Sequence, residues 1–291
     1  MSKSAAKPDL SQVTVVVVTF NSAHCVPELG RGLAEFPRVA VVDNASDDDT
    51  VSAVRCCIPQ AEIIASPRNL GFGAANNLAL RAASTQFCLL LNPDCEVSAE
   101  KIRALLVAAS DHPDAAMIVP QLLRANRTRE INYRWPATLW RSRGPGADGL
   151  CCVGFACGAA WLMNMHVMQE IGFFDEDFFL YYEDDDLCQR IFARRKAILM
   201  VPDVQLVHSS RGSVRGASPW RSEYLRGYHH ARSKIRFTAK YETLAAAEKL
   251  RRRVLALAVL TMPVRLLLPV PRHVARLAGR IVGLWRLSVQ I

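Results

Sequence analysis

Short, continuously apolar runs recur through the first part of the chain, and each ends in polar residues. They read VTVVVVTF (13–20), VAVVD (39–43), AEIIA (61–65), FCLLLN (87–92) and AAMIV (115–119). Each run has the length of a strand, and helical patterns separate them at 26–36, 73–84 and 98–110. Strands that are apolar on both sides need helices on both faces of their sheet. The sequence therefore predicts an α/β fold with a mainly parallel sheet flanked by helices.

The pattern then changes. A polar stretch at 124–150, rich in arginine, glycine and proline, predicts a long functional loop. Further strands are expected at 157–164 and 197–208, and the last residues predict a helical appendage. We therefore expect two parts, an α/β domain over residues 1–240 and a basic amphipathic helical tail over residues 241–291.

Positive charge is concentrated near the C-terminus. Residues 1–208 hold 19 Lys+Arg and 24 Asp+Glu, whereas residues 209–291 hold 17 and 3, so the formal charges are −5 and +14. The basic residues stand beside aliphatic runs, whereas a nucleic-acid-binding fold mixes them with aromatic residues in its globular part. We expect an anionic membrane surface as a partner, and no nucleic acid.

The longest uncharged run of the tail is too short to cross a bilayer. It reads VLALAVLTMPV (254–264) and ends at Arg265, whereas a transmembrane helix needs about 20 apolar residues. The composition suits helices lying in the membrane interface. The alternative is a tail that packs on its own domain with its arginines in solvent.

The N-terminus and the cysteines indicate a cytoplasmic protein. MSKSAAKPDLSQ has no apolar segment typical of a signal peptide, and the nine cysteines include no CxxC pair. An odd number of cysteines without a secretion signal is typical of reduced thiols. We expect a location at the inner face of the plasma membrane, without a disulfide framework or a zinc site.

Polar residues stand where four of the predicted strands end. Thr19 and Asn21 follow the first strand, Asp43 and Asn44 the second, SPRNLGFGAANN (66–77) the third and NPD (92–94) the fourth. Ligands of open parallel sheets bind at the carboxyl ends of the strands. A carboxylate there can accept hydrogen bonds from a ribose or a base, and glycines let backbone N–H groups approach an anion. Each residue alone is an ordinary turn former, but together they predict a nucleotide site.

One rival interpretation concerns the sequence GFGAAN (71–76). It resembles the start of a dinucleotide-binding fingerprint, but Asn76 stands where the third glycine or alanine belongs. It also follows the third predicted strand, whereas the fingerprint follows the first. A nicotinamide-dependent enzyme is therefore not favoured.

Two residues at strand ends predict a metal site. LLLNPDCEV places Asp94 just past an apolar strand, and VQLVHSSRGS places His208 at the end of another strand. Carboxylate oxygen suits Mg²⁺ or Mn²⁺, which often bridges one or two protein ligands and a diphosphate. A single histidine at a strand end is more often structural, but with Asp94 it can be a second metal ligand.

Four adjacent acids, Glu183 to Asp186, follow the apolar stretch GFFDEDFFLYY (172–182). Acids suit the start of a helix because of its dipole, and we expect Asp186 to be such a solvated residue. The aromatic residues draw the segment into the core, so at least one acid should lie at the edge of a cleft. Burial and like charges raise a carboxyl pKa toward a value useful for proton abstraction. The segment therefore predicts a general base for group transfer to a hydroxyl.

A family resemblance rests on six motifs in a fixed order: VVVVTFNS, VVDNAS, NLGFGAANN, LLLNPD, GFFDEDFFLYYEDDDLCQR and VHSSRGS. Together they strongly resemble family 2 glycosyltransferases with the GT-A fold, over about residues 12–215. The likeness is nearest to bacterial rhamnosyltransferase-like members that assemble cell-envelope polysaccharides. The Gln-x-x-Arg-Trp motif of processive members is absent from the sequence, which favours the addition of a single sugar.

The resemblance implies a role for each candidate residue. NPD stands in for the family's Asp-x-Asp motif, so Asp94 and His208 would hold the metal. Asp184 matches the catalytic base, and Glu183 would orient the acceptor or the base. The nucleotide-sugar would be bound by Thr19, Asn21, Asp43, Asn44, Arg68, Asn69, Gly71, Asn76 and Asn92.

The implied reaction inverts the configuration of the sugar. Asp184 would take the proton from an acceptor hydroxyl, and Mg²⁺ or Mn²⁺ would neutralise the departing diphosphate. The expected donor is dTDP-rhamnose or a UDP-sugar, and the expected acceptor is a cell-envelope glycan or a lipid-linked acceptor. The alternative is a catalytically inactive, nucleotide-binding membrane adaptor.

Overall fold

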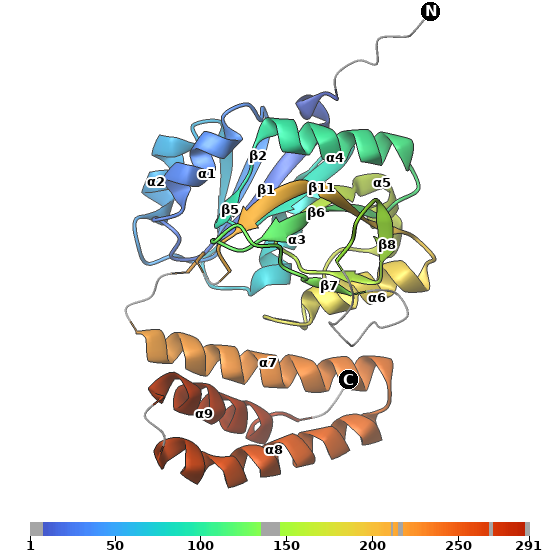
Figure 1. The fold of residues 1–291 in the computed structure, drawn as a ribbon. Helices are drawn as coiled ribbons and strands as arrows, with labels where there is room; N and C mark the ends of the chain where they lie inside the picture. Colours follow the sequence, from blue (N-terminus) through green and yellow to red (C-terminus); the bar gives the residue numbers. More distant parts are fainter. Residues whose placement is uncertain (1–7, 135–145, 211, 215–217, 268–269, 289–291) are drawn as a thin grey trace, which may run out of the picture. The chain divides into compact units, whose positions relative to one another are not determined.

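The computed structural model describes residues 8–134, 146–210, 212–214, 218–267 and 270–288. The chain divides into two compact units (Figure 1). The helical unit consists of residues 71–73, 175–186 and the chain from residue 216 onward, and the sheet unit consists of the rest.

The sheet unit is built on one mixed sheet. Among the described residues this sheet has nine strands, in the order β3-β2-β1-β4-β10-β6-β11-β5, with β8 paired to β11. Their bounds are β1 Val13–Thr19, β2 Val39–Asp43, β3 Ala61–Ala65, β4 Phe87–Leu91, β5 Cys95–Glu96, β6 Met117–Leu123, β8 Cys151–Val153, β10 Ala160–Asn164 and β11 Ile198–His208. A separate pair is formed by β7 (Tyr133–Arg134) and β9 (Phe155–Ala156).

The directions of the strands agree with the predicted parallel sheet in one half of the molecule. β1 pairs in parallel with β2 and β4, and β2 with β3. β10 is inserted antiparallel between β4 and β6, so the sheet is less uniformly parallel than the apolar runs indicate. β11 is parallel to β6, with a register shift between Val201 and Gln205. Pro202 lies in this shift, where its missing N–H is tolerated.

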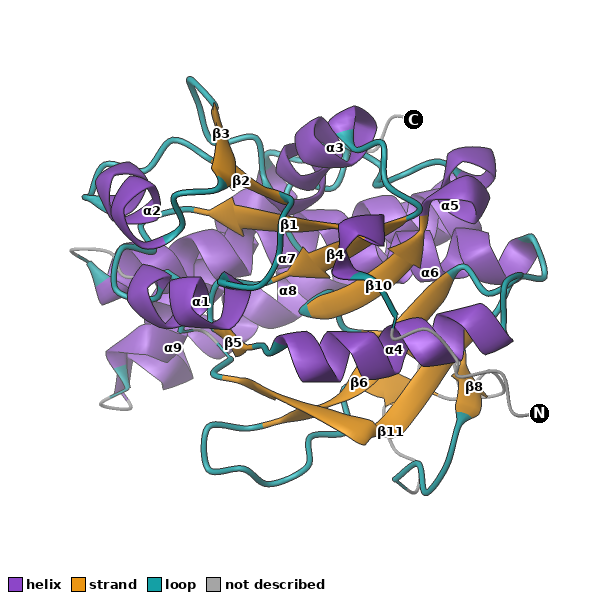
Figure 2. Ribbon diagram, turned by 90° about the horizontal axis from the view of Figure 1, so that it is seen from above, coloured by secondary structure: helices purple, strands orange, loops and turns teal. Residues whose placement is uncertain are grey.

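Helices cover both faces of the sheet. Figure 2 shows α1 and α4 along one face and α3 across the other. Alternate residues of β1 point to the α1–α4 face, and Val13, Val15 and Val17 share a buried core with Leu29 and Ile102. The helices are α1 Val26–Leu33, α2 Thr50–Cys57, α3 Phe72–Ala82, α4 Ala99–Asp111, α5 Met165–Ile171 and α6 Glu183–Ala193, and a short 3₁₀ turn spans Leu10–Gln12.

The loop expected at 124–150 is only partly described. Its residues up to 134 include β7, and residues 135–145 lie outside the described residues. Its predicted functional role therefore stays a prediction.

The helical unit contains three long helices, α7 Pro219–Tyr241, α8 Leu244–Leu267 and α9 Pro271–Trp285. Two glycines let α7 and α9 pack backbone to backbone. A Cβ at Gly227 would lie 1.9 Å from the carbonyl oxygen of Arg276, and one at Gly279 would lie 1.9 Å from that of Tyr224. The boundary predicted at residue 240 falls at the end of α7, whereas the C-terminal part of the helical unit begins at residue 216. No helix in the described part of the chain is long and apolar enough to span a bilayer.

Candidate active site

Thr19 and Asp43 end neighbouring parallel strands, and their side chains meet. The register of β1 and β2 places Thr19 opposite Asp43, and Thr19 Oγ1 donates a hydrogen bond to Asp43 Oδ1 at 3.2 Å. Ser46 donates to the same carboxylate through its hydroxyl at 2.6 Å and its backbone N–H at 3.1 Å. The fold itself therefore fixes the orientation of this buried carboxylate.

Asn21 connects the end of β1 to the loop after β2. Its φ of +52° lies in the left-handed region, which asparagine tolerates better than most residues. Its backbone N–H donates to Ser46 Oγ at 2.9 Å, and its side-chain Oδ1 accepts from the backbone N–H of Asp47 at 2.9 Å. These contacts hold two strand-end loops together at the edge where ligands are expected.

Asn44 continues this edge toward the loop after β3. Its Nδ2 donates to Asn69 Oδ1 at 3.1 Å, and its Oδ1 accepts from the backbone N–H of Leu70 at 2.8 Å. Arg68 is exposed, and Asn76 is buried in α3. The structure thus links Thr19 with Asp43, Asn21 with the loop after β2, and Asn44 with Asn69. The roles of all the predicted residues in binding a nucleotide-sugar stay predictions.

The need for glycine at position 71 comes from the chain itself. Gly71 has a φ of +88°, and a Cβ there would lie 2.1 Å from the carbonyl oxygen of Phe179. The next residue, Phe72, donates its backbone N–H to the same carbonyl at 2.9 Å. The predicted approach of Gly71 to a ligand is therefore not needed to explain this glycine.

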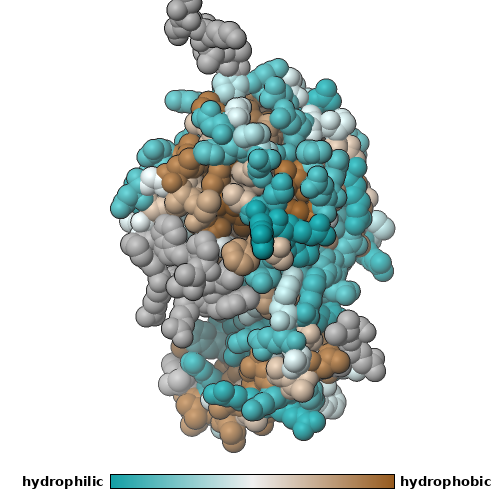
Figure 3. All heavy atoms as spheres, turned by 90° about the vertical axis from the view of Figure 1, so that its right-hand side faces the viewer, coloured by the Kyte–Doolittle hydropathy of each residue, from teal (hydrophilic) through white to brown (hydrophobic). Residues whose placement is uncertain are grey.

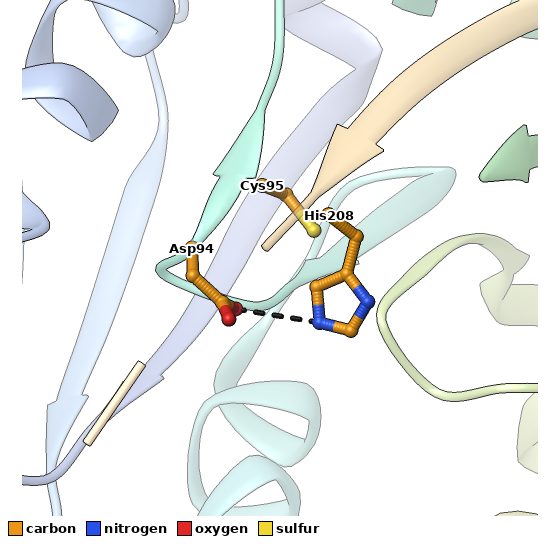
Figure 4. A group of neighbouring side chains, drawn as sticks. All are labelled: Asp94, Cys95 and His208. Atoms are coloured by element: carbon orange, nitrogen blue, oxygen red, sulfur yellow. Dashed lines mark ion pairs between the residues drawn. The ribbon is translucent and has the colours of Figure 1, made fainter. Parts of the chain in front are cut away.

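Asp94 and His208 meet through strand pairing. β5 and β11 pair antiparallel with Cys95 opposite His208, so the residue before β5 lies beside the histidine. His208 Nε2 lies 3.4 Å from Asp94 Oδ1. Figure 4 marks this ion pair with a dashed line and draws Cys95 beside it. One ligand atom from each of Asp94, Cys95 and His208 lies within 4.8 Å of the others.

The carboxylate of Asp94 fits a cation. Its side chain is 3% exposed, and its Oδ2 accepts from the backbone N–H of Gly212 at 3.0 Å. Oδ1 is buried and has no hydrogen-bond donor among the described residues. Burial acts to raise the pKa of Asp94, but the neighbouring imidazole of His208 and the backbone N–H of Gly212 outweigh it, so the pKa is lowered. An ionised carboxylate whose Oδ1 faces an imidazole nitrogen and receives no hydrogen bond from the described residues suits a divalent metal.

Cys95 is a poor member of this ligand set. Burial, and then the charge of Asp94, raise the pKa of its thiol well above the ordinary value. Mg²⁺ and Mn²⁺ also bind oxygen ligands in preference to sulfur. Asp94 and His208 are the pair predicted from the sequence, and their role as metal ligands stays a prediction.

Neighbouring polar groups orient His208. Asn92 Nδ2 lies 3.4 Å from its Nε2, and Ser210 Oγ lies 3.3 Å from its Nδ1. The loop that follows is held by His24, whose Nε2 lies 2.6 Å from the carbonyl oxygen of Gly212. Ser22 also contacts this loop, since its hydroxyl donates to the carbonyl oxygen of Ser213 at 2.6 Å.

Sequence reasoning missed four residues that organise the site: Ser22, His24, Ser46 and Gly212. The signal for Ser22, Ser46 and Gly212 was present in the motifs VVVVTFNS, VVDNAS and VHSSRGS, which place small and hydroxyl residues after a predicted site residue. His24 gave no such signal, because its partner lies far away in the sequence.

The acids at the start of α6 differ in burial. Glu183 is 5% exposed, its Oε2 has no hydrogen-bond partner among the described residues, and burial, with the charge of Asp184, raises its pKa well above the ordinary value. Asp184 is half-buried, and its Oδ1 accepts from the backbone N–H of Asp185 at 2.9 Å. The predicted role of Asp184 as the catalytic base stays a prediction.

The expectation for Asp186 was wrong. Its side chain is 0% exposed and lies 2.6 Å from Lys240 Nζ, so it is a buried ion-pair partner and not a solvated helix start. The hydroxyl of Tyr241 also donates to its Oδ1 at 2.7 Å. No local sequence pattern indicates these contacts, because both partners of Asp186 come from the end of α7.

Comparison with known proteins gives one family. The model of "Glycosyl transferase family 2" matches residues 14–200. The chain is 28% identical to the low-salt glycan biosynthesis hexosyltransferase Agl10 of Haloferax volcanii over 65% of its own length and 64% of that protein's. It is 26% identical to the N-acetylglucosaminyl-diphospho-decaprenol L-rhamnosyltransferase of Mycobacterium tuberculosis, over 74% of its own length and 80% of that protein's.

Solved structures share the fold. A mannosyltransferase from Pyrobaculum calidifontis, in complex with GDP-Man and Mn²⁺, matches with a TM-score of 0.57 and 19% identity over 97% of this chain and 90% of its own. Residues 1–349 of Staphylococcus aureus TarS with UDP match with a TM-score of 0.53 and 19% identity over 94% of this chain and 88% of that one. These likenesses show the GT-A fold.

Proposed function

Because the chain belongs to glycosyl transferase family 2, we propose that it is an inverting, metal-dependent glycosyltransferase that moves one sugar from a nucleotide-sugar to a hydroxyl group. The observation that carries the proposal is the buried Asp94 carboxylate: its Oδ1 receives no hydrogen bond from the described residues and lies 3.4 Å from His208 Nε2. Burying a carboxylate oxygen without a hydrogen-bond donor is costly, and a bound cation would offset that cost.

Residues of the sheet unit bind and orient the donor in this proposal. The edge formed by Thr19, Asn21, Asp43 and Asn44 accepts the nucleoside, with Arg68, Asn69 and Asn76 along the same side of the sheet and Asn92 beside the sugar diphosphate. Gly71, which belongs to the helical unit, would contact the nucleotide-sugar through its backbone N–H. Asp94 and His208 hold Mg²⁺ or Mn²⁺, which would neutralise the charge that develops on the leaving diphosphate. β3, β2, β1 and β4 lie side by side in the sheet in that order, so the residues that follow them are arranged in the same order along its edge.

The acids of α6 handle the acceptor. Asp184, half-buried beside the buried Glu183, removes the proton from the acceptor hydroxyl as that oxygen attacks the anomeric carbon. Attack from the face opposite the nucleotide inverts the configuration at that carbon. Glu183, whose raised pKa favours its protonated form, orients the acceptor or the base.

The choice of sugar and acceptor rests on the relatives. The Mycobacterium tuberculosis relative is named as a rhamnosyltransferase acting on a decaprenol-linked sugar, and the Haloferax volcanii relative as a hexosyltransferase of glycan biosynthesis. These names support dTDP-rhamnose as the donor and a glycan or lipid-linked acceptor. A UDP-sugar is the second donor to test.

The C-terminal helices bind an anionic membrane surface in this proposal. Large apolar side chains are exposed on α8 and α9. Leu260 and Leu267 of α8 are 72% and 86% exposed, and Trp285 of α9 is 73% exposed. Figure 3 shows apolar side chains gathered on these helices next to hydrophilic ones. The formal charge of +14 over residues 209–291 complements anionic lipids. A peripheral location at the inner face of the membrane would bring the enzyme to a lipid-linked acceptor.

The proposal is tested with purified full-length protein and a membrane lipid extract. dTDP-rhamnose, UDP-sugars and GDP-mannose are supplied in turn, with Mn²⁺ or with a chelator, and both nucleoside diphosphate release and glycosylated lipid are measured by mass spectrometry. We expect transfer from dTDP-rhamnose that stops with the chelator. Nucleotide binding without transfer from any donor would instead identify an inactive adaptor, and transfer that ignores the chelator would remove the metal from the mechanism.

A further inference from the structure

Lys240 joins the two ends of the segment that carries the acids. The last turn of α7 presents its Nζ 2.6 Å from Asp175 Oδ2 and 2.6 Å from Asp186 Oδ1. These carboxylates belong to the first and last residues of 175–186, and all three residues lie in the helical unit. One ammonium group therefore links both ends of the stretch that contains Glu183 and Asp184.

Asp186, the buried end of this link, depends on the charge of Lys240. The Asp186 side chain is 0% exposed, and the hydroxyl of Tyr241 donates to the same Oδ1 at 2.7 Å. A buried carboxylate without a cation is strongly unfavourable and either takes up a proton or moves toward water. Burial acts to lower the pKa of Lys240, but its hydrogen bonds to Asp175 and Asp186 outweigh this and raise it. The ammonium therefore stays charged while it holds both ends.

The backbone just before the acids is strained and is held by the same helix. Tyr181 and Tyr182 both have positive φ values, 68° and 70°, which are unfavourable for residues with large side chains. The His230 ring meets the edges of both tyrosines, with ring centroids 5.4 and 5.6 Å apart. Ser233 Oγ also donates to the carbonyl oxygen of Leu180 at 2.9 Å. Such a conformation persists only where its surroundings fix it.

We propose that Lys240, supported by Tyr241, is a positioning residue: it holds the segment 175–186 so that Glu183 and Asp184 have one fixed orientation. The effect on turnover rests on the proposed function, in which these acids act on the acceptor hydroxyl. The holding of the segment itself does not depend on that function. Lys240 does not touch the reacting atoms in this proposal, and it acts only through Asp186 and Asp175.

The test compares four full-length variants. Lys240→Met removes the positive charge, and Lys240→Arg keeps it. Tyr241→Phe removes only the hydroxyl that donates to Asp186, and it serves as the milder variant if Lys240→Met does not fold stably. Lys234→Met removes a lysine from the same helix and serves as the matched control. Two readouts are taken from each protein: amide hydrogen exchange of peptides covering 175–186, and kcat and KM of sugar transfer.

We expect faster exchange in 175–186 for Lys240→Met, a smaller increase for Tyr241→Phe, and none for Lys234→Met. Because a displacement of about 1 Å can cost about 100-fold in rate, kcat should fall by about 10- to 100-fold in Lys240→Met while KM for the donor changes little. Lys240→Arg should recover most of the loss. Unchanged exchange in both Lys240→Met and Tyr241→Phe would overturn the proposal, as would an unchanged kcat despite faster exchange.

The exchange readout separates this inference from the proposed function. If the protein transfers no sugar at all, the proposed function fails, but exchange in 175–186 still decides whether Lys240 holds the segment. If Asp184→Asn abolishes turnover while both Lys240 variants stay fully active, the base assignment stands and the positioning role is wrong.

Discussion

Asp94 and His208 lie 3.4 Å apart because the short strand β5 pairs antiparallel with the end of β11. The pairing brings the NPD motif to the VHSSRGS motif, which is more than a third of the chain away in the sequence. Both side chains are buried. Asp94 Oδ1 has no hydrogen-bond donor in the described part of the chain. The first prediction follows from this geometry.

Asp94→Asn should weaken metal binding more than it weakens the fold. The amide keeps the shape of the side chain but removes the negative charge, so Mn²⁺ affinity should fall by at least about 100-fold. Ser210→Ala serves as a milder comparison, because it removes only the hydroxyl 3.3 Å from His208 Nδ1 and should cost about 10-fold. Direct Mn²⁺ titration by calorimetry or electron paramagnetic resonance measures both. Equal Mn²⁺ affinity in Asp94→Asn and the unaltered protein would place the metal elsewhere.

Asp184→Asn should abolish turnover while leaving nucleotide binding intact. The substitution removes the proposed base but keeps a side chain of the same size, and losing a general base typically costs about 10²–10⁴-fold in rate. Calorimetric titration with the nucleoside diphosphate and Mn²⁺ is the control for an intact donor site. Near-normal transfer by this variant would assign the base to another residue.

The strand ends could be predicted from the sequence, and the loop contacts could not. Thr19, Asp43, Asp94 and His208 each follow an apolar run whose length fixes where the strand ends, so their common edge of the sheet follows from strand order. His24, by contrast, acts on the loop after His208, and a contact between segments so far apart in the sequence leaves no local pattern.

The errors have the same origin. Asp186 was expected in solvent because an acid suits a helix start, but its environment is set by Lys240, which follows much later in the chain. The helix α2, TVSAVRCC, was not predicted, because eight residues with a mixed pattern give little periodicity to detect. The reversed direction of β10 was missed for a similar reason, since an apolar run does not reveal which way its strand points.

Glu183→Gln should stabilise the protein at neutral pH. Burial, with the neighbouring charge of Asp184, raises the pKa of Glu183 in the folded state, so the folded protein holds a proton that the unfolded chain releases. The stability that Glu183 contributes is therefore complete below its unfolded pKa and is lost as pH rises toward the folded pKa, by up to about 1.4 kcal/mol per pH unit. Glutamine mimics the protonated form and removes this loss.

Urea unfolding at pH 5 and pH 8 measures the effect. We expect Glu183→Gln to gain about 1–3 kcal/mol at pH 8 and little at pH 5. Asp177→Asn is the matched control, because this acid of the same segment is exposed and its loss should leave the pH dependence unchanged. If the two variants respond to pH alike, Glu183 does not carry a raised pKa. Turnover of Glu183→Gln should fall, since the residue orients the acceptor or the base.

Gly279→Ala should destabilise the helical unit. The added Cβ would lie 1.9 Å from the carbonyl oxygen of Tyr224 on α7, so the two helix backbones must separate. Overpacking of this kind costs about 1–3 kcal/mol. Gly149→Ala is the control, because a Cβ there meets no atom within 4 Å. Limited proteolysis should cut Gly279→Ala faster than the control in α7 to α9, and equal rates would show that the close packing is unimportant.

Replacing exposed apolar residues of α8 should release the protein from membranes without unfolding it. Leu257, Leu260 and Leu267 are 52%, 72% and 86% exposed. Changing all three to serine therefore reduces the apolar surface that a bilayer could cover and removes little apolar surface from the core. Each leucine that enters the interface contributes about 1.5–3 kcal/mol of apolar burial at most. The triple variant should therefore lose at least about 10-fold in affinity for vesicles of phosphatidylglycerol and phosphatidylethanolamine, measured by co-sedimentation.

The sheet unit offers a matched triple control for this experiment. Val107, Leu150 and Phe192 are 47%, 49% and 48% exposed, and changing them to serine should leave vesicle binding unchanged. Binding of the unaltered protein should weaken with added salt, because arginines of the same helices, including Arg265 and Arg272, face anionic lipid headgroups in the proposal. Equal partitioning of the α8 triple variant and the control variant would show that the exposed leucines serve another purpose. A change in oligomeric state on replacing the leucines, with vesicle binding unaltered, would identify that purpose as contact with a second copy of the chain.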